Sequence, residues 1–195
     1  MKIVLATKNP HKLSEMRALF ASTSVELLSM SDVGIKKDVV ENGKTFSENA
    51  LIKAEAIAQL TSLPVMADDS GLQVKALGDF PGIYSARFME GHSYFEKNLE
   101  IIRMLQPHSD RSAQFTCVIA LCNLAPRPLV FTGIAKGSID SEPRGSHGFG
   151  YDPIFISDEL QQSFGLALED EKNKVSHRSK AAAQVIDYLK LKKLI

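Results

Sequence analysis

Apolar residues recur along the chain in runs and at helical spacing, and these patterns predict strands alternating with helices. The runs "KIVLA" at 2–6 and "VELLSM" at 25–30 each predict a strand. Between them Asn9 is a preferred helix N-cap and Pro10 suits the first helical position, so we expect a helix there. Its inward face is predicted from the apolar residues at helical spacing: Leu13, Met16, Leu19 and Phe20.

The middle of the chain continues this alternation. "TFSE" at 45–48 has the form of a capping box and predicts a helix that runs through Leu60. "PVMA" at 64–67 predicts a short strand that leads straight into "DDSGL". A further helix is predicted over 94–105, with three residues facing inward: Phe95, Leu99 and Ile102.

The second half adds a strand pair and a last helix. The runs "AQFTCVIALCNL" at 113–124 and "LVFTGIAKGSI" at 129–139 predict a hairpin of two long strands. The stretch from Arg178 predicts a helix with Val185, Ile186 and Leu189 inward. These units predict an α/β fold with a mixed twisted sheet and flanking helices. The length of 195 residues favours one domain over 1–195.

Composition and charge narrow the class of protein. The chain carries 23 basic and 23 acidic residues, which argues against a broad basic face for nucleic acid. No apolar run approaches the length of a membrane span, and the apolar N-terminal stretch is too short for a signal peptide. Cys117 and Cys122 fall on opposite faces of one predicted strand, so they cannot pair with each other. Buried reduced thiols predict a cytoplasmic protein.

The first polar segment that these patterns leave unexplained is "ATKNPHK" at 6–12. A strand that ends at a helix N-terminus exposes backbone N–H groups and the positive end of the helix dipole, which favours an anion. Thr7 and Asn9 add neutral donors, and Lys8 and Lys12 add charge. The alternative is an ordinary capped helix with solvated lysines, and this segment alone does not decide between them.

The second such segment is "ADDSGL" at 67–72, where two acids follow an apolar strand. Successive strand residues point to opposite sides, so Asp68 and Asp69 are expected to have different partners. Acids at strand ends are typical of Mg²⁺ ligands or general bases, whereas the alternative is an Asp-Ser-Gly turn. Glu41 and Lys53 flank a third segment, "ENGKTF", and their alternative is the usual solvated surface charge.

The fourth segment pairs "GSHGFGYDPIF" with "KVSHRSK". Glycines around Phe149 let a ligand approach the backbone, and an aromatic ring among them could stack on a flat base. His177 and Arg178 sit at a predicted helix start, where arginine could donate to a carbonyl oxygen in fixed geometry. The alternatives are an aromatic-glycine turn and a helix cap with exposed charge. Carboxylates with lysines, an aromatic ring and an arginine together suit Mg²⁺ and a polyphosphate.

Six ordered blocks carry this interpretation over essentially the whole chain: "LATKNPHK", "ENGKTFSENALIKA", "ADDSGL", "PGIYSARF", "GFGYDPIF" and "SHRSKA". In these blocks the sequence resembles the inosine triphosphate pyrophosphatase family, also called dITP/XTP pyrophosphatases. One position departs, because the family's first loop often reads Thr-Gly-Asn and this chain has Lys8 in the middle. The resemblance implies two lobes with an active-site cleft between them, a homodimer, and Mg²⁺-dependent hydrolysis of ITP, dITP and XTP to the monophosphate and pyrophosphate.

The resemblance also implies roles for the matched residues. Mg²⁺ is bound by Glu41 and Asp69, and Asp69 is also the general base, with Asp68 beside it. Ser70 touches the substrate. The triphosphate is held by Thr7, Lys8, Asn9, Lys12 and Lys53, of which the lysines at 12 and 53 also stabilise charge in the reaction. The base pocket comprises Phe149, Gly150, Tyr151, Asp152, Lys172, His177 and Arg178.

Other functions are compatible with the same residues. A pyrophosphatase for other modified nucleotides, or for ordinary dNTPs, would share the phosphate chemistry, although the donors of "SHR" favour a 6-oxo purine. A non-catalytic nucleotide-binding regulator would bind ITP and leave it intact. A general RNA-binding module is disfavoured, because the net charge is zero and no RNP-like aromatic motif occurs.

Overall fold

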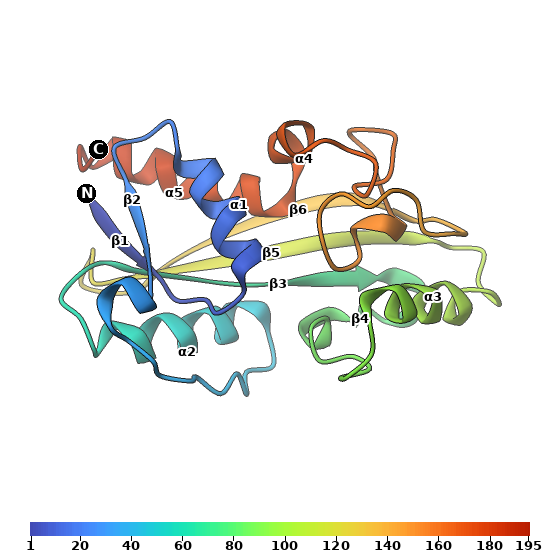
Figure 1. Cartoon of the computed structure of the whole chain (residues 1–195), viewed down its shortest axis with the longest axis horizontal. Helices are drawn as coiled ribbons and strands as arrows, with labels where there is room; N and C mark the ends of the chain where they lie inside the picture. The colour runs from blue at the N-terminus through green and yellow to red at the C-terminus, as the bar shows by residue number, and fades with distance from the viewer. The chain divides into compact units, whose positions relative to one another are not determined.

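The structure, a computed structural model, describes all residues from 1 to 195. Its strands are β1 (Lys2–Leu5), β2 (Glu26–Ser29), β3 (Val65–Val74), β4 (Phe80–Pro81), β5 (Ser112–Cys122), β6 (Leu129–Ile139) and β7 (Phe155–Ser157). Its α-helices are α1 (Pro10–Phe20), α2 (Phe46–Ala58), α3 (Tyr94–Met104), α4 (Glu169–Val175) and α5 (His177–Leu191). The α/β class is therefore confirmed, as is the mixed sheet with flanking helices (Figure 1).

The strands form one mixed sheet in the order β2-β1-β3-β5-β6-β7, with β4 paired to β3. β1 pairs in parallel with both β2 and β3, whereas β3–β4 and β6–β7 are antiparallel pairs. The predicted partners β5 and β6 are neighbours in this order. Parallel pairing of β1 requires crossover connections, and these carry α1 and α2.

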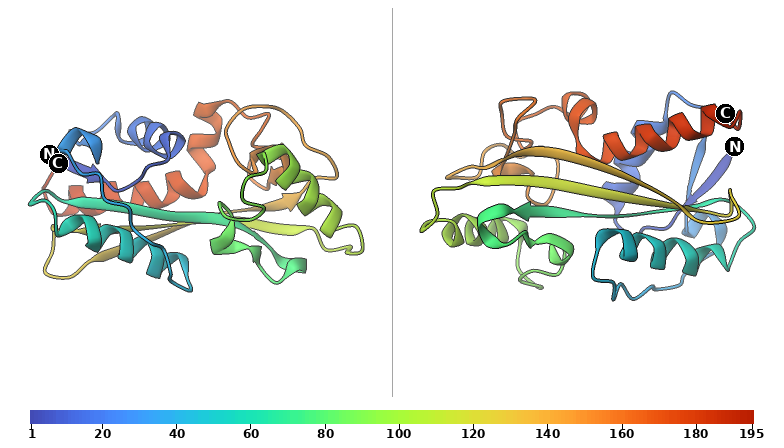
Figure 2. Two further views of the ribbon diagram at one scale, coloured as in Figure 1. Left: turned by 60° about the horizontal axis from the view of Figure 1, so that its bottom comes forward. Right: turned by 180° about the vertical axis from the view of Figure 1, so that it is seen from behind.

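The chain divides into two compact units. Unit 1 comprises residues 1–69, 117–133 and 178–195, and unit 2 comprises residues 70–116 and 134–177. In unit 1, α1 and α5 lie on one face of the strands and α2 lies on the other (Figures 1 and 2).

Each unit has its own buried apolar core. In unit 1, the core side chains come from β1, β2, β3 and β5 and from α1 and α5: Ile3, Leu5, Met16, Phe20, Leu27, Met66, Cys117, Ile119, Leu121, Ala181, Ala182, Val185 and Leu189. In unit 2, aromatic residues contribute more: Leu72, Val74, Ile101, Leu105, Ala113, Phe115, Ala135, Ile139, Tyr151, Ile154, Phe155 and Phe164. The inward prediction is confirmed for Val185 and Leu189 of α5, while Ile186 is partly buried.

The predicted helix starts are confirmed with one change. Asn9 caps α1 and Pro10 opens it. Thr45 caps α2 by accepting a hydrogen bond from the backbone N–H of Glu48. A capping box also requires the Glu48 carboxylate to accept from the N–H of Thr45. In the structure it accepts from the N–H of Lys44 instead, so the predicted capping box is incomplete. Helix α2 ends at Ala58, two residues before the predicted end.

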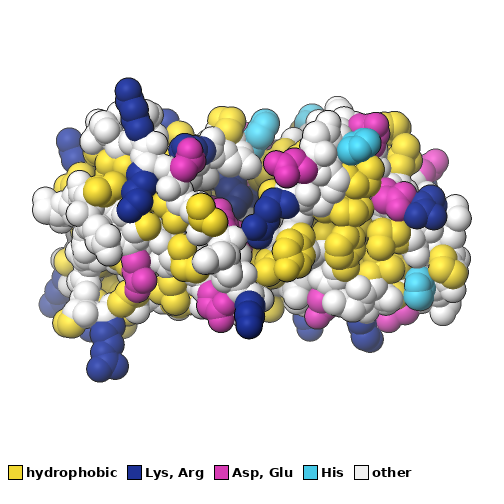
Figure 3. Space-filling model, turned by 90° about the horizontal axis from the view of Figure 1, so that it is seen from below, with side chains coloured by type: hydrophobic (Ala, Val, Ile, Leu, Met, Phe, Trp, Pro, Cys, Tyr) yellow, Lys and Arg dark blue, Asp and Glu magenta, His cyan; other side chains and the backbone are white.

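Two sequence predictions were wrong. The strand predicted at 64–67 is longer than expected, because β3 runs from Val65 through "DDSGL" to Val74, and this excludes the alternative of an Asp-Ser-Gly turn. The inward face of α3 also differs, since Phe95 is 62% exposed and Leu99 is 43% exposed. In Figure 3, which shows the molecule from below, hydrophobic side chains gather on the surface where β4 and α3 lie. The buried positions of α3 are instead Lys97, Asn98 and Ile101.

Two smaller findings bear on the class of protein. Cys117 and Cys122 are both buried free cysteines, as their spacing predicted. No helix combines the length and the apolar character that crossing a membrane requires.

Candidate active site

The bend between β1 and α1 is closed by its own side chains. The hydroxyl oxygen of Thr7 accepts from the N–H of Asn9 at 3.1 Å. The side-chain oxygen of Asn9 accepts from the N–H groups of His11 at 2.9 Å and Lys12 at 3.3 Å. These backbone donors, which the sequence predicted to be free for an anion, are therefore already bonded. The positive charge at this bend that could attract an anion is carried by side chains, among them the ammonium group of Lys12.

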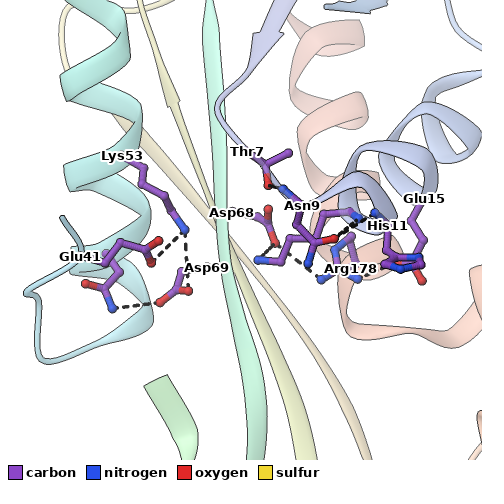
Figure 4. Close-up of polar contacts among 11 residues, drawn as sticks. Thr7, Asn9, His11, Glu15, Glu41, Lys53, Asp68, Asp69 and Arg178 are labelled. Atoms are coloured by element: carbon purple, nitrogen blue, oxygen red, sulfur yellow. Dashed lines mark hydrogen bonds and ion pairs between the residues drawn. The ribbon is translucent and has the colours of Figure 1, made fainter. Parts of the chain in front are cut away.

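β3 carries two adjacent acids whose side chains point to opposite faces of the sheet. Figure 4 shows Asp68 on the side of α1 and Asp69 on the side of α2. This follows from the alternation of side chains along a strand, and it confirms that the two acids have different partners. Asp68 and Asp69, although adjacent in sequence, therefore lie in two different environments.

Asp68 is buried among cations. Its Oδ2 atom lies 2.9 Å from Nζ of Lys12 and 3.6 Å from Nη2 of Arg178. Burial by itself would raise the pKa of Asp68, but the charges of Lys12, Arg178 and Lys53 outweigh it and hold this pKa well below its usual range. Asp68 is thus an ionised carboxylate that neutralises and fixes its cationic neighbours.

Arg178 is held from two sides. Its Nη1 atom donates to Oε2 of Glu15 on α1, while its Nη2 atom faces Asp68. The residue is only 2% exposed. Glu15 was not predicted, although it lies one helical turn after Lys12 and therefore on the same face of α1.

Asp69 occupies a different environment. Its Oδ2 atom accepts from the side-chain amide of Asn49 at 3.1 Å, and its Oδ1 atom lies 3.8 Å from Nζ of Lys53. Lys53 also donates to Glu41 at 3.0 Å. Burial raises the pKa of Asp69, and the nearby Glu41 adds to this, although Lys53 and Lys12 oppose it. Asp69 therefore holds a proton more readily than Asp68 does.

Asn49 is a site residue that the sequence predictions missed. Its side-chain oxygen accepts from the N–H of Gly43, and its amide donates to Asp69. A signal was present, because Asn49 is a polar residue in an alanine-rich helix and lies one turn before Lys53. Asn49 fixes both the loop that carries Glu41 and the orientation of Asp69.

The acids around Lys53 fit a hard cation. Glu41 and Asp69 both approach the ammonium group of Lys53, so their carboxylates converge on one position of positive charge. The chain places no three potential ligands of the types Asp, Glu, His or Cys together. Mg²⁺ is commonly bound through one or two carboxylates together with phosphate oxygens of the substrate, and two carboxylates suffice for that arrangement.

The predicted base-binding residues of unit 2 form a second cluster. Oδ2 of Asp152 accepts from the N–H of Phe149 at 2.8 Å and from Nζ of Lys172 at 2.7 Å. Asp152 and Lys172 are both buried, and Nζ of Lys172 lies 5.1 Å from the ring centroid of Phe149. Gly148 has φ +70°, and a Cβ atom there would lie 2.1 Å from Oδ2 of Asp152, so this turn requires glycine.

Other residues of unit 2 are held by aromatic and carbonyl contacts. The hydroxyl of Tyr151 donates to the carbonyl oxygen of Ser85 at 2.8 Å, and Tyr151 is buried. The His177 ring stacks on Phe115, with 4.7 Å between centroids and 13° between planes. Ser70 is partly exposed on β3. Of the two aromatic residues, Phe149 is partly exposed and Tyr151 is buried.

The structure brings the predicted site residues together as two sets. Unit 1 gathers Thr7, Asn9, Lys12, Glu41, Lys53, Asp68, Asp69 and Arg178. Unit 2 gathers Phe149, Gly150, Tyr151, Asp152 and Lys172, and it also contains Ser70 and His177. Lys8 stands apart, because its ammonium group pairs with Asp38 at the surface. Arg178 belongs to unit 1, where it contacts Glu15 and Asp68.

Comparison with known proteins finds one family that matches nearly the whole chain. Residues 3–188 match the Ham1 family. A dITP/XTP pyrophosphatase of Thermoanaerobacter pseudethanolicus is 43% identical over 197 residues, covering 100% of this chain and 98% of that protein. A dITP/XTP pyrophosphatase of Yersinia pseudotuberculosis is 44% identical, covering 97% of this chain and 98% of that protein.

Solved structures show the same likeness. A HAM1 protein from Coxiella burnetii superposes with a TM-score of 0.89 at 40% identity, covering 97% of this chain and 98% of that one. The Ham1 protein of Staphylococcus aureus superposes with a TM-score of 0.89 at 36% identity, covering 98% and 100%.

Proposed function

The chain belongs to the Ham1 family, and from this premise we propose that it hydrolyses noncanonical purine nucleoside triphosphates, namely ITP, dITP and XTP, to the monophosphate and pyrophosphate. The observation that carries the proposal is the pair Asp68 and Asp69. One strand presents an ionised carboxylate bound to Lys12 and a second carboxylate of raised pKa beside Lys53 and Glu41. Such a set can hold a polyphosphate and activate a water molecule.

Asp69 is the proposed general base. It takes a proton from a water molecule, whose oxygen bonds to the α-phosphorus as the bond from that phosphorus to the bridging oxygen of the β-phosphate breaks. The leaving group is pyrophosphate. A base is most effective when its pKa approaches the working pH, and burial moves the pKa of Asp69 in that direction. Asn49 orients the carboxylate by donating to one of its oxygens.

Lys12 and Lys53 are the proposed phosphate-binding cations. Their side chains are only 15% and 13% exposed, so their charge is weakly screened by water. They stabilise negative charge as it moves to the leaving pyrophosphate. Mg²⁺, held by Glu41 and Asp69, would add positive charge to the phosphate oxygens. Thr7 and Asn9 shape the bend from which Lys12 projects, and Lys8 is an additional phosphate contact on the surface.

Base recognition is assigned first to residues of unit 2. Phe149 offers a ring face, and the buried pair of Asp152 and Lys172 offers charged hydrogen-bonding groups beside it. His177 and Arg178 follow each other at the start of α5 and supply donors suited to a 6-oxo group. Ser70 is the proposed substrate contact that follows Asp69 on β3.

The remaining features belong to the same proposal. One pyrophosphatase domain spans residues 1–195, it acts in the cytoplasm as a homodimer, and it has no nucleic-acid or membrane partner. The neutral net charge supports the absence of a nucleic-acid partner.

The deciding experiment compares turnover of dITP, dATP and dGTP, with and without Mg²⁺. Turnover is measured as the pyrophosphate released. We expect Mg²⁺-dependent turnover with a strong preference for dITP. Release of orthophosphate alone would mean attack at the γ-phosphorus and would contradict the proposed reaction. Tight binding of ITP without any turnover would identify a nucleotide-binding regulator instead.

A further inference from the structure

The loop that carries Phe149 has a glycine on each side of that residue. Gly148 and Gly150 flank Phe149 with φ +70° and +69°, in a region that glycine enters without strain. Glycines supply no side chains that could pack and hold the loop. A loop of this kind orients a ligand well only if its backbone is held by other elements.

α3 supplies such a restraint through Asn98. Its side-chain amide donates to the carbonyl oxygen of Gly150 at 3.2 Å. Asn98 is only 2% exposed, and a buried amide costs free energy unless it is hydrogen-bonded. This polar residue occupies the buried face of α3 while Phe95 and Leu99 of the same helix are exposed. The helix therefore presents polar donors to the protein interior beside the apolar side chain of Ile101.

The neighbouring residue on α3 restrains the segment that follows β4. Nζ of Lys97 donates to the carbonyl oxygen of Ala86 at 3.1 Å. The adjacent Ser85 accepts from the hydroxyl of Tyr151 through its own carbonyl oxygen. Tyr151 directly follows Gly150, so the contacts close a ring that runs from α3 through the "PGIYSARF" segment to the loop and back to α3.

Ser85 also ties this ring to the sheet. Its hydroxyl oxygen accepts from the N–H of Leu72 on β3 at 3.0 Å and donates to the carbonyl of Gly82 at 2.7 Å. The "PGIYSARF" segment, to which the sequence alone assigned no role, therefore connects β3 with the glycine loop. Strand β3 is thus linked through Ser85 to the loop that carries Phe149.

We propose that Asn98 is a positioning residue for base recognition, which acts by holding the carbonyl of Gly150 so that Phe149 keeps its orientation. The inference rests on the proposed function, since it concerns the base pocket of that reaction. It predicts that loss of the Asn98 donor weakens binding of the base and leaves the chemistry at Asp69 intact.

Two variants separate positioning from stability. Asn98→Leu removes the amide donor and keeps the approximate size of the side chain. Oδ1 of Asn98 has no hydrogen-bond partner, so the change removes no other hydrogen bond of this side chain. Asn98→Asp is closer in shape but places an acceptor against the carbonyl of Gly150. We expect KM for dITP to rise about 3- to 10-fold in Asn98→Leu and further in Asn98→Asp, with kcat within about twofold, which is the size of one net hydrogen bond. The control is Leu99→Ala on the exposed face of α3, which should leave KM unchanged.

The experiment measures kcat and KM for dITP and dATP, the thermal unfolding midpoint, and calorimetric binding of dITP without metal. The ratio of kcat/KM for dITP to that for dATP should fall in both variants while the unfolding midpoint of Asn98→Leu stays near that of the wild type. Unchanged dITP affinity in a folded Asn98→Leu variant would overturn the inference, and so would a smaller effect of Asp than of Leu. If the wild type fails to hydrolyse dITP, the proposed function fails, and the binding measurements still decide the role of Asn98.

Discussion

Asp68 and Asp69 are neighbours on β3, yet Asp68 lies 2.9 Å from Lys12 on one side of the sheet and Asp69 lies 3.8 Å from Lys53 on the other. The two carboxylates therefore have different charges around them, and their pKa values move in opposite directions from the usual value. Paired acids whose environments separate their pKa values are the arrangement in which one acts as a base and the other as a fixed counter-charge.

Asp69→Asn is expected to abolish most turnover and to leave substrate binding measurable. The change keeps the size of the side chain but removes the proton acceptor, and loss of a general base costs about 10²–10⁴-fold in rate. Steady-state turnover of dITP and calorimetric binding check the result. The matched control is Asp187→Asn on the exposed face of α5, which should behave as the wild type. Retention of more than about a tenth of the rate would reassign the base, with Asp68 as the next candidate.

Asp68→Asn is expected to destabilise the fold in a pH-dependent manner. The folded pKa of Asp68 lies below the unfolded value of 3.8, so its charge stabilises the protein above that pH, and this stabilisation is lost as the pH falls through the folded pKa. At pH 7 the variant leaves Lys12 without its carboxylate partner, and breaking a buried pair costs about 3 kcal/mol. Urea unfolding from pH 7 down to pH 3 should show the difference shrinking below about pH 4. A difference independent of pH would mean that packing and not charge explains the loss.

Lys53→Ala and Lys12→Ala are expected to impair all triphosphates to the same degree. Phosphate contacts carry no information about the base, so kcat/KM for dITP, dGTP and dATP should fall by one common factor. The control Lys190→Ala removes an exposed lysine near the end of α5 and should change nothing. A lysine variant that altered the preference between dITP and dGTP would contradict a phosphate role.

Removal of divalent metal is expected to stop turnover, and Ca²⁺ should support it weakly or not at all. Two carboxylates converge beside Lys53, and Mg²⁺ is suited to such a set together with phosphate oxygens. Ca²⁺ takes more ligands at longer distances and should misplace the attacking water. Pyrophosphate release in EDTA, with Mg²⁺ added back as the control, checks this. Undiminished activity in EDTA would rule out a metal requirement.

Arg178→Ala is expected to narrow the gap between dITP and dATP more than the gap between dITP and dGTP. Arginine only donates hydrogen bonds, so it suits the 6-oxo group of hypoxanthine and guanine and not the 6-amino group of adenine. Rejection of an analogue that leaves a buried donor unpaired can reach about 10⁴–10⁵-fold. The measurement is kcat/KM for the three substrates.

The contacts of Arg178 with Glu15 and Asp68 define the competing outcome. Equal losses on all three substrates would mean that Arg178 serves to place Asp68 and Lys12. Glu15→Gln separates the two roles, because it removes the carboxylate that holds Arg178. If Arg178 recognises the base, this variant should also lose preference for dITP over dATP.

Local rules account for much of the fold and of the unit 1 site. The start of α1 was predictable because Asn9 and Pro10 act on their own helix end, and the divergence of Asp68 and Asp69 was predictable because side chains alternate along any strand. Residue type alone marked the carboxylates and lysines as candidates for a phosphate site, and their roles were implied by the resemblance to a known family.

Only the tertiary structure decided the rest. β3 continues through "DDSGL" because Gln73 and Val74 pair with Pro81 and Phe80 of β4, so a local turn signal yields to sheet pairing. The buried face of α3 carries Asn98 and Lys97 because their donors meet carbonyl oxygens from segments distant in the chain. The spacing of apolar residues could not indicate this. Hydrophobic periodicity reports only how much apolar surface a helix face offers. The buried face of α3 also depends on hydrogen-bond partners from distant segments, because buried polar groups need such partners.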